Sequence, residues 1–111
     1  YTPVLKWATN LKQNMAGIFR YHKAARQDFM EAVAWYEEKS PGKGLDFANA
    51  FVNTLHKIAA NPDIYRKVFK DFRKISMPDF PYYIIYKIRK KTIYILAIYH
   101  NKRQKYWEQR V

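Results

Sequence analysis

The sequence predicts a single α+β domain, built as a strand, a helical hairpin and then a three-stranded antiparallel meander. Apolar residues recur at helical spacing between residues 25 and 58, and the chain after residue 71 holds three short runs rich in Tyr, Ile and Phe. No break in composition divides the 111 residues into two domains. Hydrophobic residues make up 49% of the chain, which is enough for a packed core.

Residues 18–22 fit a short strand that leads into the first helix. The apolar stripe of that helix consists of Ala25, Phe29, Ala32, Val33 and Tyr36. Ser40–Gly44 ends the helix, because Pro blocks its continuation and Gly permits a turn. The second helix has its own stripe of Phe47, Phe51, Leu55 and Ile58, and it ends at Asn61-Pro62. Two antiparallel helices around a short turn form a helical hairpin.

Three predicted strands follow, over residues 72–77, 80–89 and 92–99, with breaks at Pro78-Asp79 and Lys90-Lys91. The last two strands are apolar at odd and even positions alike, so we expect both faces of the sheet to be covered. The helical hairpin can cover one face. The other needs a cover that a partner could supply.

Residues 1–14 do not continue the pattern of strands and helices described above, and we leave them unassigned. Their apolar residues Val4, Trp7, Ala8 and Leu11 have helical spacing, which fits a short docked helix. An extension ahead of a native start at Met15 fits equally well. We therefore expect the domain to span residues 15–111.

The composition excludes several classes of site. Without cysteine there is no disulfide, thiolate metal site or Cys nucleophile, which fits a cytoplasmic protein. No apolar run approaches the roughly 20 residues of a membrane helix, so we expect no membrane partner. The three glycines form no phosphate loop, and no histidine has metal-ligand spacing to a carboxylate. We expect neither a cofactor nor a metal, and a carboxylate-based enzyme does not fit.

Positive charge is concentrated in the second half of the chain. The formal net charge is +12, of which residues 64–111 carry +10. Such a field attracts acidic protein, nucleic acid or anionic lipid, although excess lysine can also serve solubility. The asymmetry between the halves favours an acidic partner.

The cations gather around the meander, with aromatic residues between them. They comprise Arg66, Lys67, Lys70, Arg73, Lys74, the run from Lys87 to Lys91, Lys102 and Arg103. Cations can grip phosphates or carboxylates, and exposed rings can stack on bases. For Tyr82 to Tyr86 we favour a core role. For Arg103, Tyr106 and Trp107, which follow the last strand, a contact role and a core or solvated role both stay open.

Four motifs, in order, resemble the RelE/ParE toxin superfamily, in its ParE-like, plasmid-stabilisation branch. They are Ala32–Glu37 with Ser40–Gly44 and Phe47, Phe80–Tyr86, Ile95–Arg103, and Tyr106-Trp107. The match covers about residues 16–110. The resemblance implies the growth-inhibiting toxin of a type II toxin–antitoxin pair, with an α+β fold.

The resemblance also implies a cognate antitoxin whose acidic C-terminal segment wraps the toxin, and the basic half of the chain is suited to receive it. Met30 and Trp35 lie off the main stripe of the first helix, so they are candidate contacts or flanking core. The full set of predicted target or antitoxin contacts is Arg73, Lys74, Lys102, Arg103, Tyr106, Trp107, Met30 and Trp35.

The superfamily has two modes of action: RelE-like members cut messenger RNA on the ribosome, and ParE-like members inhibit DNA gyrase. An alignment by eye places Tyr83 where a RelE-like catalytic arginine is expected, and Ser76 where a lysine is expected. Lys74 and Arg103 keep two other basic positions. Because tyrosine cannot bring a cation to a phosphate, the nuclease set is incomplete.

We therefore predict a non-enzymatic toxin that binds an essential target, DNA gyrase by resemblance. The alternative is a ribosome-dependent mRNA endoribonuclease that uses Lys74, His100, Arg103 and Tyr106, because a histidine beside an arginine permits acid–base chemistry. A second alternative is a non-enzymatic nucleic-acid-binding module.

Overall fold

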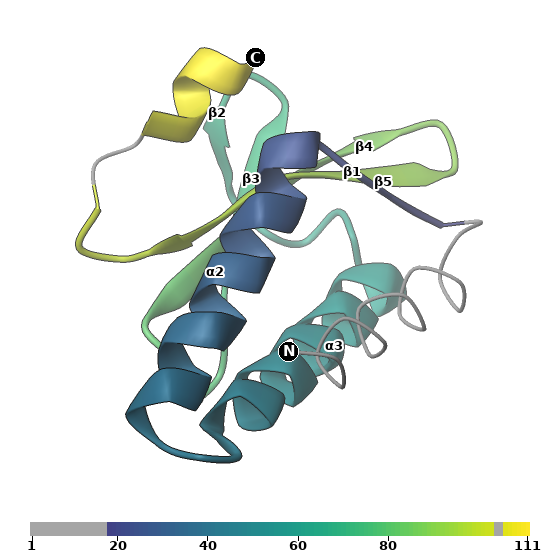
Figure 1. Ribbon diagram of the computed structural model, residues 1–111. Helices are drawn as coiled ribbons and strands as arrows, with labels where there is room; N and C mark the ends of the chain where they lie inside the picture. The colour runs from purple at the N-terminus through teal and green to yellow at the C-terminus, as the bar shows by residue number, and fades with distance from the viewer. Residues whose placement is uncertain (1–17, 104–105) are drawn as a thin grey trace.

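The computed structural model describes residues 18–103 and 106–111. Its elements are β1 (Phe19–Tyr21), α2 (Lys23–Lys39), α3 (Lys43–Ala60), β2 (Lys67–Phe69), β3 (Phe72–Ser76), β4 (Tyr82–Arg89), β5 (Thr92–His100) and the 3-10 helix η1 (Tyr106–Arg110). The predicted order of a strand, a helical hairpin and a meander is confirmed (Figure 1). The predictions for residues 1–14 and Met15 lie outside the described residues. Within the described part, no helix is both long enough and apolar enough to cross a membrane.

The strands form one five-stranded sheet in the order β1-β5-β4-β3-β2. β3, β4 and β5 pair antiparallel as the predicted meander, and β1 lies parallel to β5. The α2–α3 hairpin carries the chain from β1 to β2 at the opposite edge of the sheet, and the strands that follow lead back to β5 beside β1. The sequence analysis missed β2 and η1.

The turn between the helices explains the Ser-Pro-Gly-Lys-Gly segment. Gly42 has φ +89°, a left-handed conformation that favours glycine. A Cβ at Gly44 would lie 2.8 Å from the Val33 carbonyl oxygen, so only glycine fits this close approach of the two helices. The Glu37 carboxylate accepts hydrogen bonds from the Gly42 and Gly44 N–H groups and so caps the start of α3.

Two apolar clusters lie on the two faces of the sheet. The first joins the stripes of α2 and α3 to one face, as predicted. The second consists of Phe72, Ile85, Leu96, Ala97, Tyr99 and Trp107. Trp107, from η1, has no exposed surface. The chain thus supplies its own cover for this face, which corrects the expectation that a partner could supply it.

A bulge in β5 decides which side chains reach which face. Ile85 pairs with Ala97 and Tyr86 with Ile95, so Leu96 is an extra residue in β5. Before the bulge, Ile95 belongs to the cluster under the helices. After it, Ile98 belongs to that cluster. Because side chains alternate along a strand, the extra residue changes which side chains after it face the helices. His100 therefore points toward α2.

The buried ion pair between Asp28 of α2 and Arg110 of η1 holds this bulge. The Arg110 guanidinium donates to Asp28 Oδ2 at 2.7 Å and to Oδ1 at 3.0 Å, and also to the Leu96 carbonyl oxygen at 3.0 Å. The Ile98 N–H donates to Asp28 Oδ2 at 3.1 Å. Both side chains are largely buried, with exposed fractions of 7% for Asp28 and 13% for Arg110. The hydrogen bonds that Arg110 donates to the Asp28 carboxylate raise the pKa of Arg110 above its ordinary value.

We predict that Asp28→Asn lowers the free energy of unfolding by about 3 kcal/mol, because it leaves a buried guanidinium without its counter-charge. Urea denaturation followed by circular dichroism measures this loss. The matched control is Glu31→Gln, on the exposed side of the same helix, which we expect to change stability by less than about 0.5 kcal/mol. Equal effects of the two substitutions would contradict the role of the ion pair.

Candidate functional site

A groove of about 600 Å³ lies between α2 and the C-terminal end of β5. α2 contributes one wall, with Asp28, Glu31 and Trp35. The other wall comes from the start of β4, the end of β5 and the turn that follows, with Tyr82, His100, Lys102 and Arg103. We call it the α2–β5 groove.

Trp35 is the prominent apolar feature of the α2 wall. Its side chain is 52% exposed, although tryptophan is usually well buried. Tyr36 packs edge-on against its ring at 4.9 Å between centroids, and Lys39 Nζ lies 5.1 Å from the ring centre. These contacts hold the ring in place while about half of the residue stays exposed. An exposed, fixed tryptophan beside a groove is the kind of side chain that anchors protein–protein contacts.

His100 organises the opposite wall. Its ring packs edge-on against Tyr82 at 5.3 Å. Its Nδ1 accepts a hydrogen bond from the Lys102 N–H at 3.1 Å, and its carbonyl oxygen accepts one from the Arg103 N–H at 3.0 Å. His100 thus shapes the turn that carries the two cations at the rim of the groove.

The charges of the groove are divided between its walls. Asp28 and Glu31 lie on the α2 side, whereas Lys102 and Arg103 lie on the β5 side. Arg110 already neutralises Asp28. Burial raises the pKa of Tyr106, whose hydroxyl lies 3.4 Å from Asp28 Oδ1, and the negative charge of Asp28 adds to this effect. Burial also raises the pKa of Tyr82, and the positive charge of Arg103 partly offsets that rise.

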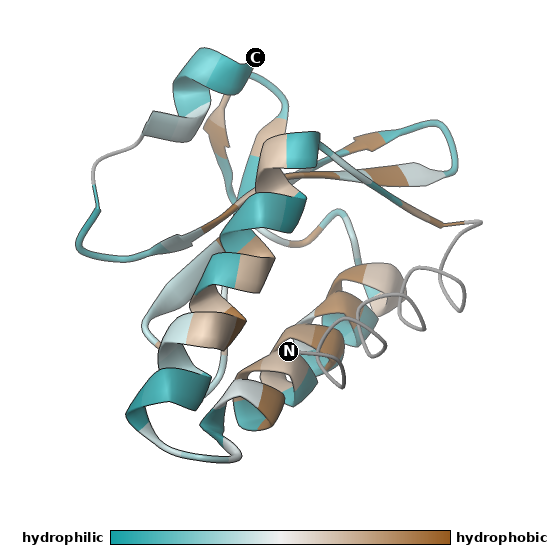
Figure 2. Cartoon of the chain, in the orientation of Figure 1, coloured by the Kyte–Doolittle hydropathy of each residue, from teal (hydrophilic) through white to brown (hydrophobic). Residues whose placement is uncertain are grey.

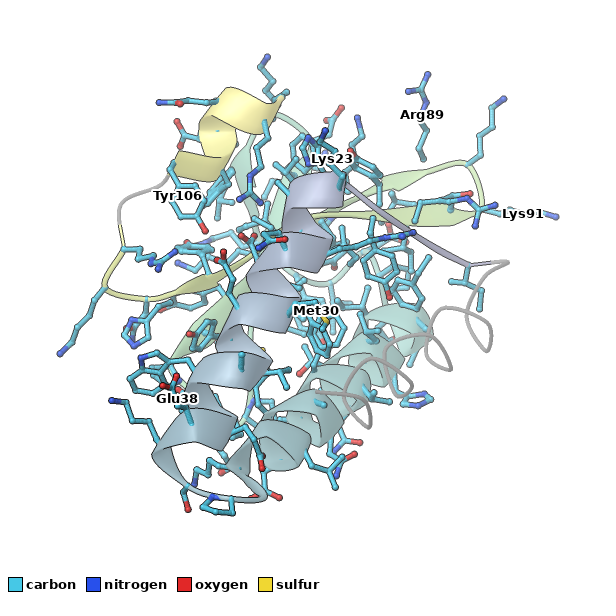
Figure 3. The ribbon with its side chains drawn as sticks, viewed as in Figure 1. Lys23, Met30, Glu38, Arg89, Lys91 and Tyr106 are labelled. Carbon is cyan, nitrogen blue, oxygen red and sulfur yellow. The ribbon has the colours of Figure 1, made fainter. Side chains whose placement is uncertain are left out.

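The structure brings together three of the predicted contact residues. Trp35, Lys102 and Arg103 all line the α2–β5 groove. Tyr106, labelled at the start of η1 in Figure 3, is joined to the groove through its hydroxyl, which lies 3.4 Å from Asp28 Oδ1.

The other predicted contacts lie elsewhere. The Arg73 guanidinium donates to the carbonyl oxygens of Asp63 and Tyr65, at 2.8 and 2.7 Å, and so holds the chain after α3. Met30 is half-buried and packs against the first cluster, between α2 and α3 (Figure 3). Trp107 has no surface to offer a partner, so its proposed contact role is corrected to a core role.

The candidate ribonuclease residues are divided between the two faces of the sheet. Lys74 Nζ lies 3.9 Å from the centre of the Tyr83 ring, which packs against the second cluster. His100 packs against Tyr82, which belongs to the first cluster. The sheet therefore separates Lys74 from His100. No group of three or more His, Asp or Glu side chains among the described residues could hold a metal ion.

The sequence did not single out Asp28 or Arg110 as candidate site residues. A signal for Asp28 was present, because it lies three residues after Ala25 and four before Ala32, within the apolar stripe of the first helix. A carboxylate in such a stripe needs a buried partner. Nothing in the local sequence marks Arg110 as that partner.

Comparisons with known proteins agree with this architecture. Residues 19–105 match the family model described as the ParE toxin of the type II toxin–antitoxin system parDE. The chain is 32% identical over 83 residues to toxin ParE2 of Mycobacterium tuberculosis, from strains CDC 1551 / Oshkosh and ATCC 25618 / H37Rv, covering 74% of this chain and 79% of each relative. A structure of the chromosomal ParDE system from P. aeruginosa shares the fold, with a TM-score of 0.65 at 20% identity over 75% of this chain and 94% of that one. The chain therefore belongs to the ParE toxin family of type II toxin–antitoxin systems.

Proposed function

We propose that this ParE-family toxin inhibits growth in the cytoplasm by binding DNA gyrase through the α2–β5 groove, and that a cognate antitoxin neutralises it. The observation that carries the proposal is that the exposed Trp35 lines the same groove as the cations Lys102 and Arg103. An aromatic anchor beside charges at the rim is the usual layout of a protein-binding surface.

Binding accounts for the groove better than catalysis does. A nuclease needs a cation at the scissile phosphate and an acid or base within reach of it. Tyr83 supplies no cation, and Lys74 lies on the opposite face of the sheet from His100. His100 Nδ1 is already engaged with the Lys102 N–H. These contacts favour a toxin without enzymatic activity.

An antitoxin fits the same groove. The similar P. aeruginosa structure is described as a ParDE toxin–antitoxin system, which supports a protein partner of this kind. An antitoxin segment with an acidic C-terminal part would place carboxylates near Lys102 and Arg103 and an apolar side chain on Trp35. Charge complementarity of this type sets the orientation and speeds association. An antitoxin that occupies this groove would exclude the target from it.

We predict that Trp35→Ala raises the concentration needed to inhibit gyrase supercoiling by at least about tenfold, because truncating an aromatic anchor costs about 2 kcal/mol or more. The matched control is Leu45→Ala, which removes a side chain of similar exposure, 51%, from α3. It should inhibit as the parent does. Equal loss in both variants would exclude the groove, and a parent chain that leaves supercoiling untouched at large excess would exclude gyrase.

For the ribonuclease alternative, we predict that cellular transcripts stay intact while the chain is induced and growth stops. Sequencing of RNA ends before and after induction measures cleavage. Arg103→Ala should relieve the growth arrest without altering the pattern of RNA ends, because Arg103 serves here as a binding residue. New RNA ends that depend on the chain and disappear in Arg103→Ala would instead establish a ribonuclease.

A further inference from the structure

A second groove, of about 570 Å³, lies at the other end of the β4–β5 hairpin, over the second cluster. Five cations from three parts of the chain line it: Arg20, Lys87, Arg89, Lys90 and Arg110. The described lining residues include no Asp or Glu. Figure 2 shows the tip of this hairpin as hydrophilic, and Figure 3 shows Arg89 and Lys91 at that end of the molecule. We call it the basic groove.

The cations of the basic groove are set in place by the fold. Lys87 Nζ lies 5.1 Å from the centre of the Phe72 ring and 5.8 Å from that of Tyr94, so two aromatic rings position its ammonium group. Arg89 and Lys90 are exposed at the tip of the hairpin. Asp28 already balances Arg110. Among the described lining residues, no Asp or Glu side chain offsets the charges of Lys87, Arg89 and Lys90.

The two grooves differ in what they offer a partner. The α2–β5 groove presents a half-exposed tryptophan and charges of both signs. In the basic groove, the large apolar lining residues Phe72 and Leu96 are only 3% and 1% exposed, and Val111 alone among the described lining residues is an exposed apolar side chain. A protein partner needs apolar surface to bury at the centre of its interface. Nucleic-acid interfaces are more polar and much more positively charged.

The arrangement of the cations also fits a repeating anion. Lys87 and Arg89 are two residues apart on β4 and therefore share one face, about 6.7 Å apart along the strand. Arginine binds phosphate oxygens in a two-pronged manner, and lysine acts as a point charge beside it. We propose that the basic groove binds the phosphate backbone of nucleic acid, without reading its sequence. This site is separate from the α2–β5 groove, so its failure would leave the proposed toxin function untouched.

Counterion release makes the proposal quantitative. Each cation that neutralises a phosphate of duplex DNA changes the slope of log affinity against log salt by about −0.9. If Lys87, Arg89 and Lys90 each engage one phosphate, the slope is about −2.7. Bases need not be contacted, so duplexes of different sequence should bind alike.

The test measures binding of the full chain to a fluorescein-labelled 24-base-pair DNA duplex by anisotropy, across a range of potassium chloride concentrations. The variant is Arg89→Gln with Lys90→Asn. Lys90 has φ +57°, and asparagine tolerates that conformation, so the hairpin should stay folded. We expect the magnitude of the slope to decrease by about 1.8 and the affinity at low salt to fall at least tenfold.

The matched control is Lys43→Gln with Lys57→Gln, which removes the same charge from the two ends of α3. It should keep the slope and affinity of the parent. The proposal is overturned if the control loses as much as the variant, because binding would then reflect net charge alone. It is also overturned if the parent does not bind the duplex at low salt, or if poly-glutamate displaces the duplex and binds the groove more tightly, because the site would then be one for acidic protein.

Discussion

The ion pair between Asp28 and Arg110 is the constraint on which the rest of this structure depends. It joins the second turn of α2 to η1, and it satisfies the carbonyl oxygen of the bulge residue Leu96 and the N–H of Ile98 just after the bulge. Burying two charges is costly, and four hydrogen bonds of 2.7 to 3.1 Å to the pair offset this cost. Asp28 lines the α2–β5 groove and Arg110 lines the basic groove, so the same pair forms part of the wall of both.

The bulge explains how one short strand serves two surfaces. If the side chains of β5 alternated strictly from Ile95 onward, with no bulge, His100 would point away from α2 and Tyr99 toward that helix. With it, Tyr99 packs on Trp107 at 6.0 Å between ring centres, while His100 shapes the turn that carries Lys102 and Arg103. The bulge also places His100 on the helix-covered face of the sheet, whereas Lys74 lies on the opposite face. The preference for binding over catalysis thus rests on backbone geometry as well as on residue identity.

The sequence predicted the elements that carry a clear local signal. The stripes of α2 and α3 follow from helical spacing, and the three strands of the meander follow from runs rich in Tyr, Ile and Phe between short breaks. The Ser40–Gly44 turn follows from its glycines and proline. β2 and η1 were missed because their few apolar residues are adjacent and show neither strand alternation nor helical spacing. Of the predicted contact residues, Trp35, Lys102 and Arg103 meet in one groove. The burial of Trp107 and the placement of Arg73 depend on tertiary packing, which no local pattern shows.

The central claim is that Trp35 anchors the target in the α2–β5 groove. Hydroxyl-radical footprinting of the chain, alone and bound to DNA gyrase, tests it most directly, because it reports the solvent exposure of individual side chains. The account predicts that oxidation of Trp35 falls sharply in the complex while that of Leu45, equally exposed in the free chain, stays the same. A complex in which Trp35 remains as reactive as in the free chain would contradict it.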